Sequence, residues 1–351
     1  MAKKKRKGHY SGIGGQAVIE GVMMKKNDKY SIAVRTPSGD IDVTLEEYDS
    51  FTPSKTLLKI PFIRGVFNFI DSLILGIRTL NYSATFYEED DKKKERDRRE
   101  RNYKGKKKEK FFDRVLGDNA DKILSGITVL ISLAFAIVLF MLVPYFLSQV
   151  FRMVIVNNTV IAIIEGLLRV LIFVLYVVVI SAMKDIKRVY KYHAAEHKCI
   201  NCLESGKILN VANVRRSSRL HKRCGTSFMF FVVFVSIILF MFIRVEDPIM
   251  RVVIRLLLLP VIASISYEII RLAGKSNNII VKILSAPGMM LQRLTTCELD
   301  GAETSKGDES SKRYADDDII EVAIAAVDAV FDWREYLINE FGYDPSDMYQ
   351  Q

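Results

Sequence analysis

Residues 160–183, VIAIIEGLLRVLIFVLYVVVISAM, are the stretch that determines the class of this protein. The stretch is almost entirely apolar and has the length of about twenty residues that an α-helix needs to cross a bilayer. Only Glu165 and Arg169 interrupt it, and a helix places these two side chains on one face because they are four residues apart. We therefore predict a transmembrane helix that carries one acidic and one basic group.

Three further stretches have the same character, at residues 123–150, 228–243 and 252–272. Half of the 351 residues are hydrophobic and 26% are charged, and the two classes lie in separate blocks, as is typical of membrane proteins. The sequence thus predicts an α-helical polytopic membrane protein with four transmembrane helices. The fourth helix contains Pro260, which predicts a kink near its centre.

The positive charges predict the orientation of these spans. The connection between the second and third spans, residues 184–225, contains eleven Lys and Arg residues, whereas the other connections contain few charges. Because basic segments stay in the cytoplasm, this loop and both termini are predicted to be cytoplasmic. The net charge of +10 is then explained by the basic segments that stay on the cytoplasmic side of the membrane, and no specific nucleic acid is predicted as a partner. The basic start of the chain has no apolar segment behind it, so it is interpreted as a membrane anchor instead of a signal peptide.

The cytoplasmic loop contains the pattern His-x-x-Glu-His at residues 193–197. In a helix, His193 and His197 share one face and can bind a single metal ion. Glu196 stands beside the second His and is predicted to act as general base on a metal-bound water, as a further ligand or as a second-shell acceptor. The alternative interpretation is that these side chains are solvated in a basic loop.

A second pair of metal-binding side chains, His221 and Cys224, lies just before the third span. Three of the four His and one of the four Cys in the chain thus fall into two short segments. We predict a site for Zn²⁺ or a similar divalent ion, bound by His193, His197 and one or both of His221 and Cys224. With four protein ligands the site is structural, and with three ligands and a water it can hydrolyse a substrate.

Cys199 and Cys202 form a Cys-x-x-Cys pair beside the same motif. This spacing suits a metal site or a redox pair, but no thioredoxin-like βαβ pattern surrounds it. We therefore rank these two cysteines below His221 and Cys224 and interpret them as incidental.

The segment before the spans is predicted to be cytoplasmic or interfacial. Residues 1–56 form a basic tail and a small β-rich domain, in which a glycine-rich turn leads into one apolar strand and two later strands pair as a hairpin. Residues 57–86 form an amphipathic or re-entrant helix. Residues 87–121 form a solvated charged linker or a long exposed helix, because they contain almost no apolar side chains.

The spans and their loop occupy residues 122–275, and residues 276–351 form a cytoplasmic C-terminal segment. This segment begins with an amphipathic stretch that is predicted to break at residues 287–288, which are Pro-Gly. A polar loop follows, and residues 317–338 have the apolar periodicity of one final helix that packs on the cytoplasmic domain.

Four charged residues are predicted to lie at membrane depth, namely Glu165, Arg169, Arg255 and Glu268. Charges in lipid are costly and usually face partners or a water-filled cavity. Glu165 and Arg169 either neutralise each other or serve a function, and the two interpretations have equal weight.

Four motifs, in order along the chain, resemble those of the bacterial YqhQ family, which has a domain of unknown function in multi-pass membrane proteins. They are GGQAVIEGVMM at 14–24, HAAEHK at 193–198, SRLH with RCGTSF at 218–228, and APG with LQRLTT at 286–296. The resemblance covers most of residues 12–331, apart from an insertion at about 301–315. The Cys-x-x-Cys pair is not part of the family pattern. The resemblance implies a bacterial inner or plasma membrane and a metal-dependent enzyme that uses the same His, Glu and Cys residues, and it leaves the reaction open.

Three functions are compatible with this sequence. The leading hypothesis is a metal-dependent hydrolase that cleaves a peptide or a lipid-linked bond at the membrane surface. The first alternative is a non-enzymatic membrane-biogenesis factor, whose basic face binds a protein partner and whose His/Cys cluster is structural. The second alternative is a transporter or channel component, which with four spans would act as a homo-oligomer. The lipid bilayer is a partner in all three.

Overall fold

The computed structural model describes residues 9–52, 56–101, 120–243, 245, 247–275, 278–299 and 316–342. The chain divides into two compact units. Unit 1 contains Met1–Asp90, Val178–Val232 and Leu259–Gln351, and unit 2 contains Asp91–Val177 and Val233–Leu258. The basic start, residues 102–119 of the predicted charged linker and the insertion at 301–315 lie outside the described residues.

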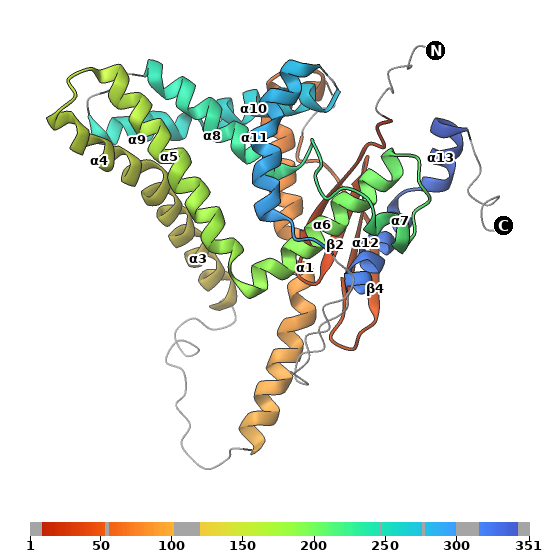
Figure 1. Cartoon of the computed structure of the whole chain (residues 1–351). Coiled ribbons are helices and arrows are strands. Elements are labelled where there is room, and N and C mark those ends of the chain that lie inside the picture. Colours follow the sequence, from red (N-terminus) through yellow and green to blue (C-terminus); the bar gives the residue numbers. More distant parts are fainter. Residues whose placement is uncertain are drawn as a thin grey trace, which may run out of the picture. The chain divides into compact units, whose positions relative to one another are not determined.

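Unit 1 is built around a four-stranded antiparallel sheet with the strand order β1-β2-β3-β4 (Figure 1). The strands are β1 (Ile13–Val18), β2 (Gly21–Lys26), β3 (Lys29–Arg35) and β4 (Ile41–Glu47). The predicted small N-terminal sheet is therefore confirmed. The prediction of one strand after a glycine-rich turn is wrong, because Gly14 and Gly15 lie inside β1 and the chain reverses at Glu20, which has a φ of 51°.

Both faces of this sheet are covered, which explains why β2 and β3 are apolar at successive positions. One face, which includes Met24, shares a hydrophobic core with α6 (Lys184–Glu204) and α12 (Asp316–Val330). The other face, which includes Met23, packs against α1 (Ile63–Arg101). Segments from the start, the middle and the end of the chain thus fold into a single body in unit 1.

The C-terminal segment forms two helices, so the prediction of one helix at 317–338 is wrong. α12 ends at Val330, and α13 (Trp333–Phe341) begins directly after Asp332. The carboxylate of Asp332 accepts a hydrogen bond of 3.0 Å from the amide of Glu335. Asp is a preferred N-cap residue, and this cap starts a new helix in a new direction although the apolar pattern continues.

α1 is one helix of 39 residues that includes the first part of the charged run and continues to Arg101. Its first turn is fastened to α10 (Leu259–Lys275) by an ion pair. Nε and Nη2 of Arg64 donate hydrogen bonds of 2.6 and 2.5 Å to the two carboxylate oxygens of Glu268. Glu268, one of the charges predicted at membrane depth, is therefore paired with a residue outside the predicted spans.

α11 (Ile279–Thr295) continues through Pro287, so the predicted break at this position is wrong. Gly288 lies where α11 approaches the start of α8 (Gly225–Phe242): a Cβ at this glycine would lie 3.0 Å from the Cβ of Ser227. This close helix packing stabilises the helical conformation and outweighs the hydrogen bond that Pro287 cannot donate.

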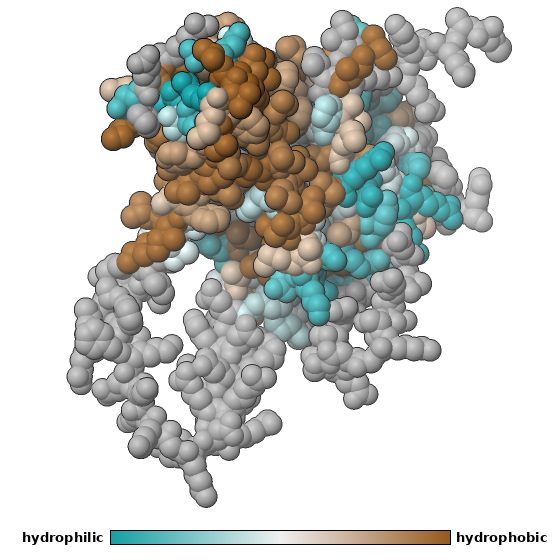
Figure 2. Space-filling model, turned by 60° about the vertical axis from the view of Figure 1, so that its left-hand side comes forward, coloured by the Kyte–Doolittle hydropathy of each residue, from teal (hydrophilic) through white to brown (hydrophobic). Residues whose placement is uncertain are grey.

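The charged end of α1 (Asp91–Arg101) belongs to unit 2. The rest of unit 2 consists of apolar helices and turns whose outer side chains are hydrophobic (Figure 2). Besides the second part of α8, its elements are α3 (Ala120–Ile137), a π-helical turn η3 (Val138–Leu142), α4 (Val143–Val150), η4 (Phe151–Met153), α5 (Asn158–Ser181, up to Val177) and α9 (Pro248–Leu257). The short elements of unit 1 are η1 (Leu57–Lys59) and α7 (Val211–Arg215).

Three helical segments in the described part of the chain are long and apolar enough to cross a membrane, at Gly126–Met153, Asn158–Ser181 and Gly225–Phe242. A fourth is obtained if Ile249–Leu257 and Leu259–Ala273 form one broken span. The two halves of this pair are bent by 42° at the break before Pro260, which confirms the predicted kink.

Candidate metal centre

α6 presents His193 and His197 on one face, because four residues make little more than one helical turn. The centroids of the two rings are 4.4 Å apart. The helix is fastened to the sheet through the carboxylate of Glu20 in the β1–β2 turn. This carboxylate accepts hydrogen bonds from Nη2 of Arg188 at 2.5 Å and from the hydroxyl of Tyr192 at 3.2 Å.

Backbone carbonyl groups orient both imidazole rings. Nδ1 of His193 lies 2.9 Å from the carbonyl oxygen of Thr295, and Nδ1 of His197 lies 2.6 Å from that of Arg219. Because a carbonyl only accepts hydrogen bonds, each Nδ1 carries the proton and each Nε2 keeps a lone pair. Metal-binding histidines are usually oriented in this way, by a hydrogen bond from the nitrogen that does not bind the ion.

Cys224, at the start of α8, offers its sulfur atom as a third ligand beside the two histidine nitrogens. Its carbonyl oxygen accepts a hydrogen bond of 3.0 Å from the amide of Ser227, so Cys224 caps the helix. Its Sγ lies 3.2 Å from Nε2 of His193 and 3.3 Å from the amide nitrogen of Thr226. The free amides of a helix N-terminus stabilise a thiolate, which is the form of Cys that binds metals.

The ligand atoms of His193, His197 and Cys224 all lie within 4.8 Å of one another. Nitrogen and sulfur atoms bound to one tetrahedral zinc ion are about 3.5 Å apart. The three side chains therefore fit a single ion of this kind and leave its fourth position to a water molecule or a substrate. The structure brings three of the four predicted ligands together, and metal binding itself stays a prediction.

His221, the fourth predicted ligand, lies beside this group. Its ring centroid is 5.7 Å from that of His197. Its Nε2 accepts a hydrogen bond of 3.3 Å from the guanidinium of Arg223 and lies 3.8 Å from the carboxylate of Glu204. Burial lowers the pKa of His221 below its usual value, although Glu204 opposes this shift. The His221 ring is therefore neutral, and its Nε2 faces Glu204 at the end of α6.

Glu196 lies against β1. A Cβ at Gly15 would be 2.8 Å from the Cγ of Glu196, so the two elements are in close contact here. Burial raises the pKa of Glu196 to about 7, and the nearby His193 opposes this shift. Within the described ranges, no residue donates a hydrogen bond to its carboxylate. The carboxylate predicted to be a general base is thus buried near His193, and in the described ranges it has no hydrogen-bond donor of its own.

α6 also holds the loop at residues 205–224, which carries Cys224. Lys198 and Asn201, on the turn after His197, donate hydrogen bonds of 2.7–3.0 Å to carbonyl groups of this loop. The acceptors are the carbonyls of Arg215, Ser217, Ser218 and Leu220. The motif helix therefore provides two ligands and also fixes the segment that leads to the third.

The end of α11 completes the site, and our sequence reasoning did not assign it there. Gln292 is fully buried and binds the backbone amide and carbonyl of His221 at 2.9 and 2.7 Å. Thr295 supplies the carbonyl oxygen that orients His193. The signal that could have found them is the LQRLTT motif, which places uncharged polar residues in an otherwise apolar stretch.

Cys199 and Cys202 belong to the hydrophobic core between α6, α12 and the sheet. Sγ of Cys202 donates to the carbonyl oxygen of Ile208 at 3.4 Å. Burial raises the pKa of both thiols, that of Cys202 to about 11. Both side chains are thus buried, protonated core residues, in agreement with their low rank in the sequence analysis.

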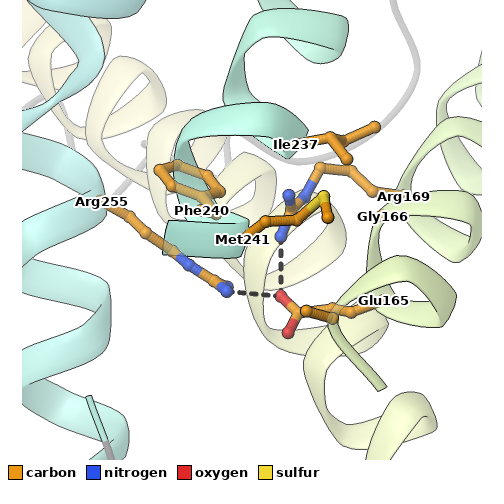
Figure 3. A pocket seen from close by; sticks show the side chains of 8 residues that line it. Glu165, Gly166, Arg169, Ile237, Phe240, Met241 and Arg255 are labelled. Atoms are coloured by element: carbon orange, nitrogen blue, oxygen red, sulfur yellow. Dashed lines mark hydrogen bonds and ion pairs between the residues drawn. The ribbon is translucent and has the colours of Figure 1, made fainter. Parts of the chain in front are cut away.

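The charged residues predicted at membrane depth lie elsewhere. In unit 2, Oε1 of Glu165 forms ion pairs with Nη2 of Arg169 at 2.8 Å and with Nη2 of Arg255 at 2.6 Å (Figure 3). Glu165 and Arg169 do face each other, as their spacing predicts, and the sequence did not indicate that Arg255 joins them.

Comparison of the amino-acid sequence with known families places the chain in a class of uncharacterised proteins. Residues 60–307 match the family described as "Protein of unknown function (DUF1385)", and the chain belongs to this family. The chain is 36% identical over 294 residues to "Uncharacterized protein YqhQ" of Bacillus subtilis (strain 168), a match that covers 81% of this chain and 86% of that protein. Membership in the YqhQ family, which the motifs predicted, is therefore confirmed. No solved structure is significantly similar to this chain.

Proposed function

We propose that this protein is a zinc-dependent hydrolase of the bacterial inner or plasma membrane, with its metal centre on the cytoplasmic side. One observation carries the proposal: the ligand atoms of His193, His197 and Cys224 lie within 4.8 Å of one another. Two nitrogens and one sulfur form a ligand set that zinc favours, and three protein ligands with an open fourth position are typical of catalytic zinc sites.

The residues around the group have the properties that such an enzyme needs. A bound zinc ion would supply a Lewis acid and an activated water molecule. The carbonyls of Thr295 and Arg219 hold the two imidazoles in the tautomer that exposes Nε2. Glu196, which has no hydrogen-bond donor among the described residues, would accept a proton during hydrolysis and return it to the leaving group.

The position of the third ligand supports a substrate at the membrane surface. Cys224 directly precedes α8, which is one of the segments long and apolar enough to cross a bilayer. A bond that reaches the open coordination position would therefore lie at the level of the lipid head groups, so we propose a peptide or lipid-linked substrate. The exposed basic residues of the segment 184–225, namely Lys184, Lys187, Lys207 and Arg216, offer a surface for an acidic protein partner, and a homo-oligomer is compatible with this arrangement.

Metal content tests this proposal. Protein purified without chelators should contain close to one zinc per chain, and the double variant His193→Ala with His197→Ala should contain almost none. His9→Ala is the matched control, because His9 contacts Glu340 and lies outside the group. Equal and negligible metal in all three proteins would remove the proposal.

A second function, that of a non-enzymatic membrane-biogenesis factor, is supported by the way the group connects distant segments. His193 and His197 lie on α6, Cys224 begins α8, and α11 contributes the carbonyl of Thr295. An ion at this point would fasten three parts of unit 1 and raise its stability without any reaction.

Glu196→Gln distinguishes the two functions, because it removes the proton acceptor and keeps the shape of the side chain. We expect zinc content to be unchanged in this variant. Zinc-dependent cleavage of fluorogenic peptides or of phospholipids by the purified protein in lipid nanodiscs should fall by at least about a hundredfold. Absence of cleavage in wild type and variant, with zinc retained in both, would favour the structural role.

A further inference from the structure

Unit 2 contains a cavity of about 200 Å³ that lies between two helix junctions. Its walls come from the junction of α4 and α5, at residues 149–159, and from the junction of α8 and α9, at residues 243–251. Polar side chains from the first junction, among them Gln149, Asn158 and Thr159, line the cavity together with charged groups. A polar cavity between apolar helices is unusual and indicates a ligand or a water-filled path.

The charges around this cavity are predominantly positive. Three arginines line it, Arg152, Arg251 and Arg255, against a single carboxylate, Glu165. Glu165 already pairs with Arg255 at 2.6 Å and with the buried Arg169 at 2.8 Å, so one negative charge faces two positive charges (Figure 3). The triad thus retains one net positive charge although all three side chains are buried.

The other two arginines add to this excess. Arg251 donates hydrogen bonds to the carbonyl oxygen of Val245, the shorter of 2.5 Å, and its guanidinium stacks over Tyr145 at 4.5 Å. Asp247 is engaged as the cap of α9, where it accepts a hydrogen bond from the amide of Met250. In the part of the chain that the structure describes, neither Arg251 nor Arg152 forms an ion pair with a carboxylate.

An uncompensated positive charge between apolar helices is costly, and an anion that binds there would remove this cost. Arginine forks match the oxygens of a phosphate in pairs, and Asn158 and Thr159 offer further donors. The cavity is smaller than a typical site of about 300–1,000 Å³ for a drug-sized molecule, so it fits a phosphate with few additional atoms.

We infer that this cavity binds a phosphate group, carried by a lipid head group or by a soluble phosphate compound. The site lies at the ends of helices that are long enough to cross a bilayer, and in the membrane protein proposed above these ends lie at the depth of lipid phosphates. The inference does not depend on the metal centre, because its residues all belong to unit 2.

Calorimetric titration of the full-length protein in a neutral detergent tests the inference. Dihexanoyl phosphatidylglycerol and inorganic phosphate are the two probes, and dihexanoylglycerol, which lacks phosphate, is the negative probe. We expect at least one phosphate probe to bind and the negative probe not to bind. Tighter binding of the lipid identifies a head-group site, and equal or tighter binding of inorganic phosphate identifies a site for soluble phosphates.

Two variants with little risk to folding make the test specific. Arg152→Gln changes an exposed side chain, and Arg251→Gln keeps a side chain of similar length at the rim. Each should weaken phosphate binding by about tenfold, the value of one charge-assisted hydrogen bond. Arg293→Gln, an exposed arginine of α11 in unit 1, is the control and should bind like wild type. No binding of either phosphate probe to wild type, or unchanged binding in the Arg152→Gln/Arg251→Gln double variant, would overturn the inference.

Discussion

Gly15 has no side chain, and this allows the sheet to lie in close contact with Glu196, the proposed general base. A Cβ at this position would lie 2.8 Å from the carbonyl oxygen of Met23 and 2.8 Å from the Cγ of Glu196. Backbone atoms of a paired strand cannot move easily, so the clash outweighs the advantage that alanine has over glycine in a strand.

Gly15→Ala should therefore lower the free energy of unfolding by about 1–3 kcal/mol. Gly14→Ala is the matched control, because nothing lies within 4 Å of a Cβ at that position, and it should be neutral or slightly stabilising. Thermal unfolding of the purified variants, followed by Trp333 fluorescence, measures both changes. Equal stability of the two variants would contradict the close contact between β1 and α6.

Glu204 links the loop, the N-terminal segment and α6, and its charge makes this link dependent on pH. Burial alone would raise its pKa, but the nearby His221 and the positive charge of Arg223 outweigh burial, so the pKa is lower than usual. A carboxylate with a lowered pKa in the folded state contributes stability above its unfolded pKa of about 4.5. This contribution is lost as the pH falls through the folded pKa.

We expect Glu204→Gln to destabilise the protein at pH 7 by about 1.5–3 kcal/mol, because it removes charge-assisted hydrogen bonds to Ser11 and Arg223. The difference from wild type should shrink as the pH is lowered below about 4. Unfolding midpoints of both proteins at pH 7, 5, 4 and 3 provide the measurement. A difference that stays constant across this range would show that the charge of Glu204 is not what stabilises the fold.

At the scale of elements, α11 fastens the loop that precedes α8 through one side chain. Gln292 binds both backbone groups of His221 and donates to the hydroxyl of Ser227 at 2.8 Å. Gln292→Ala would leave these buried groups without partners, and outer-shell contacts of this kind typically change metal affinity by about 10–100-fold. We predict a loss of zinc affinity in this range, measured by competition with a chromogenic chelator. Arg293→Ala, one residue further on the exposed side of α11, should retain the affinity of wild type.

The sequence predicted the elements best where one physical signal dominates. The apolar spans, the helical spacing of His193 and His197, and the presence of a small sheet all follow from periodicity and length, and these agree with the structure. The ends of elements were harder to predict. Asp332 starts a new helix inside a continuous apolar pattern, and Pro287 fails to end α11, because local capping and packing against α8 determine these positions.

The candidate site was predicted in part for a similar reason. The types of residue at 193–197 and 221–224 indicated a metal, but the identity of the third ligand depends on the path of the loop. Lys198, Asn201 and Gln292 fix this path through contacts with backbone carbonyls and amides, and the sequence does not indicate which backbone groups they contact. As a result, Cys224 joins the two histidines, and His221 turns towards Glu204.

At the scale of the whole molecule, the hydrophobic core of unit 1 limits how the chain can cross a membrane. This core contains side chains of the N-terminal sheet, of α6 and of α12. A single core cannot extend across a bilayer, so these three segments must lie on one side. The chain must then cross an even number of times between the sheet and α6, and again between α6 and α12.

Between the sheet and α6, Gly126–Met153 and Asn158–Ser181 provide two crossings. Between α6 and α12, Gly225–Phe242 provides one, so the bent pair α9–α10 must provide the return. We therefore propose four crossings, with the sheet, α6 and α12 on the same side of the membrane. The turn at 154–157 and the start of α9 then face the opposite side. With four crossings, the break at Leu258 lies inside a spanning segment. With three crossings, the sheet and α12 would lie on opposite sides of the membrane.

Labelling with a membrane-impermeant maleimide in intact cells tests this topology. Asn157→Cys places an exposed thiol on the turn at 154–157, and Ile249→Cys places one at the start of α9. Ser38→Cys and Asn339→Cys place exposed thiols between β3 and β4 and on α13. We expect the first two to react in intact cells and the last two to react only after the membrane is permeabilised. All four variants also carry Cys297→Ser, because Cys297 is partly exposed, and the buried Cys199, Cys202 and Cys224 should not react in either case, which gives the background. Labelling of Ser38→Cys and Asn339→Cys from opposite sides would require the chain to cross an odd number of times. The shared core of the sheet, α6 and α12 could not form in such a protein.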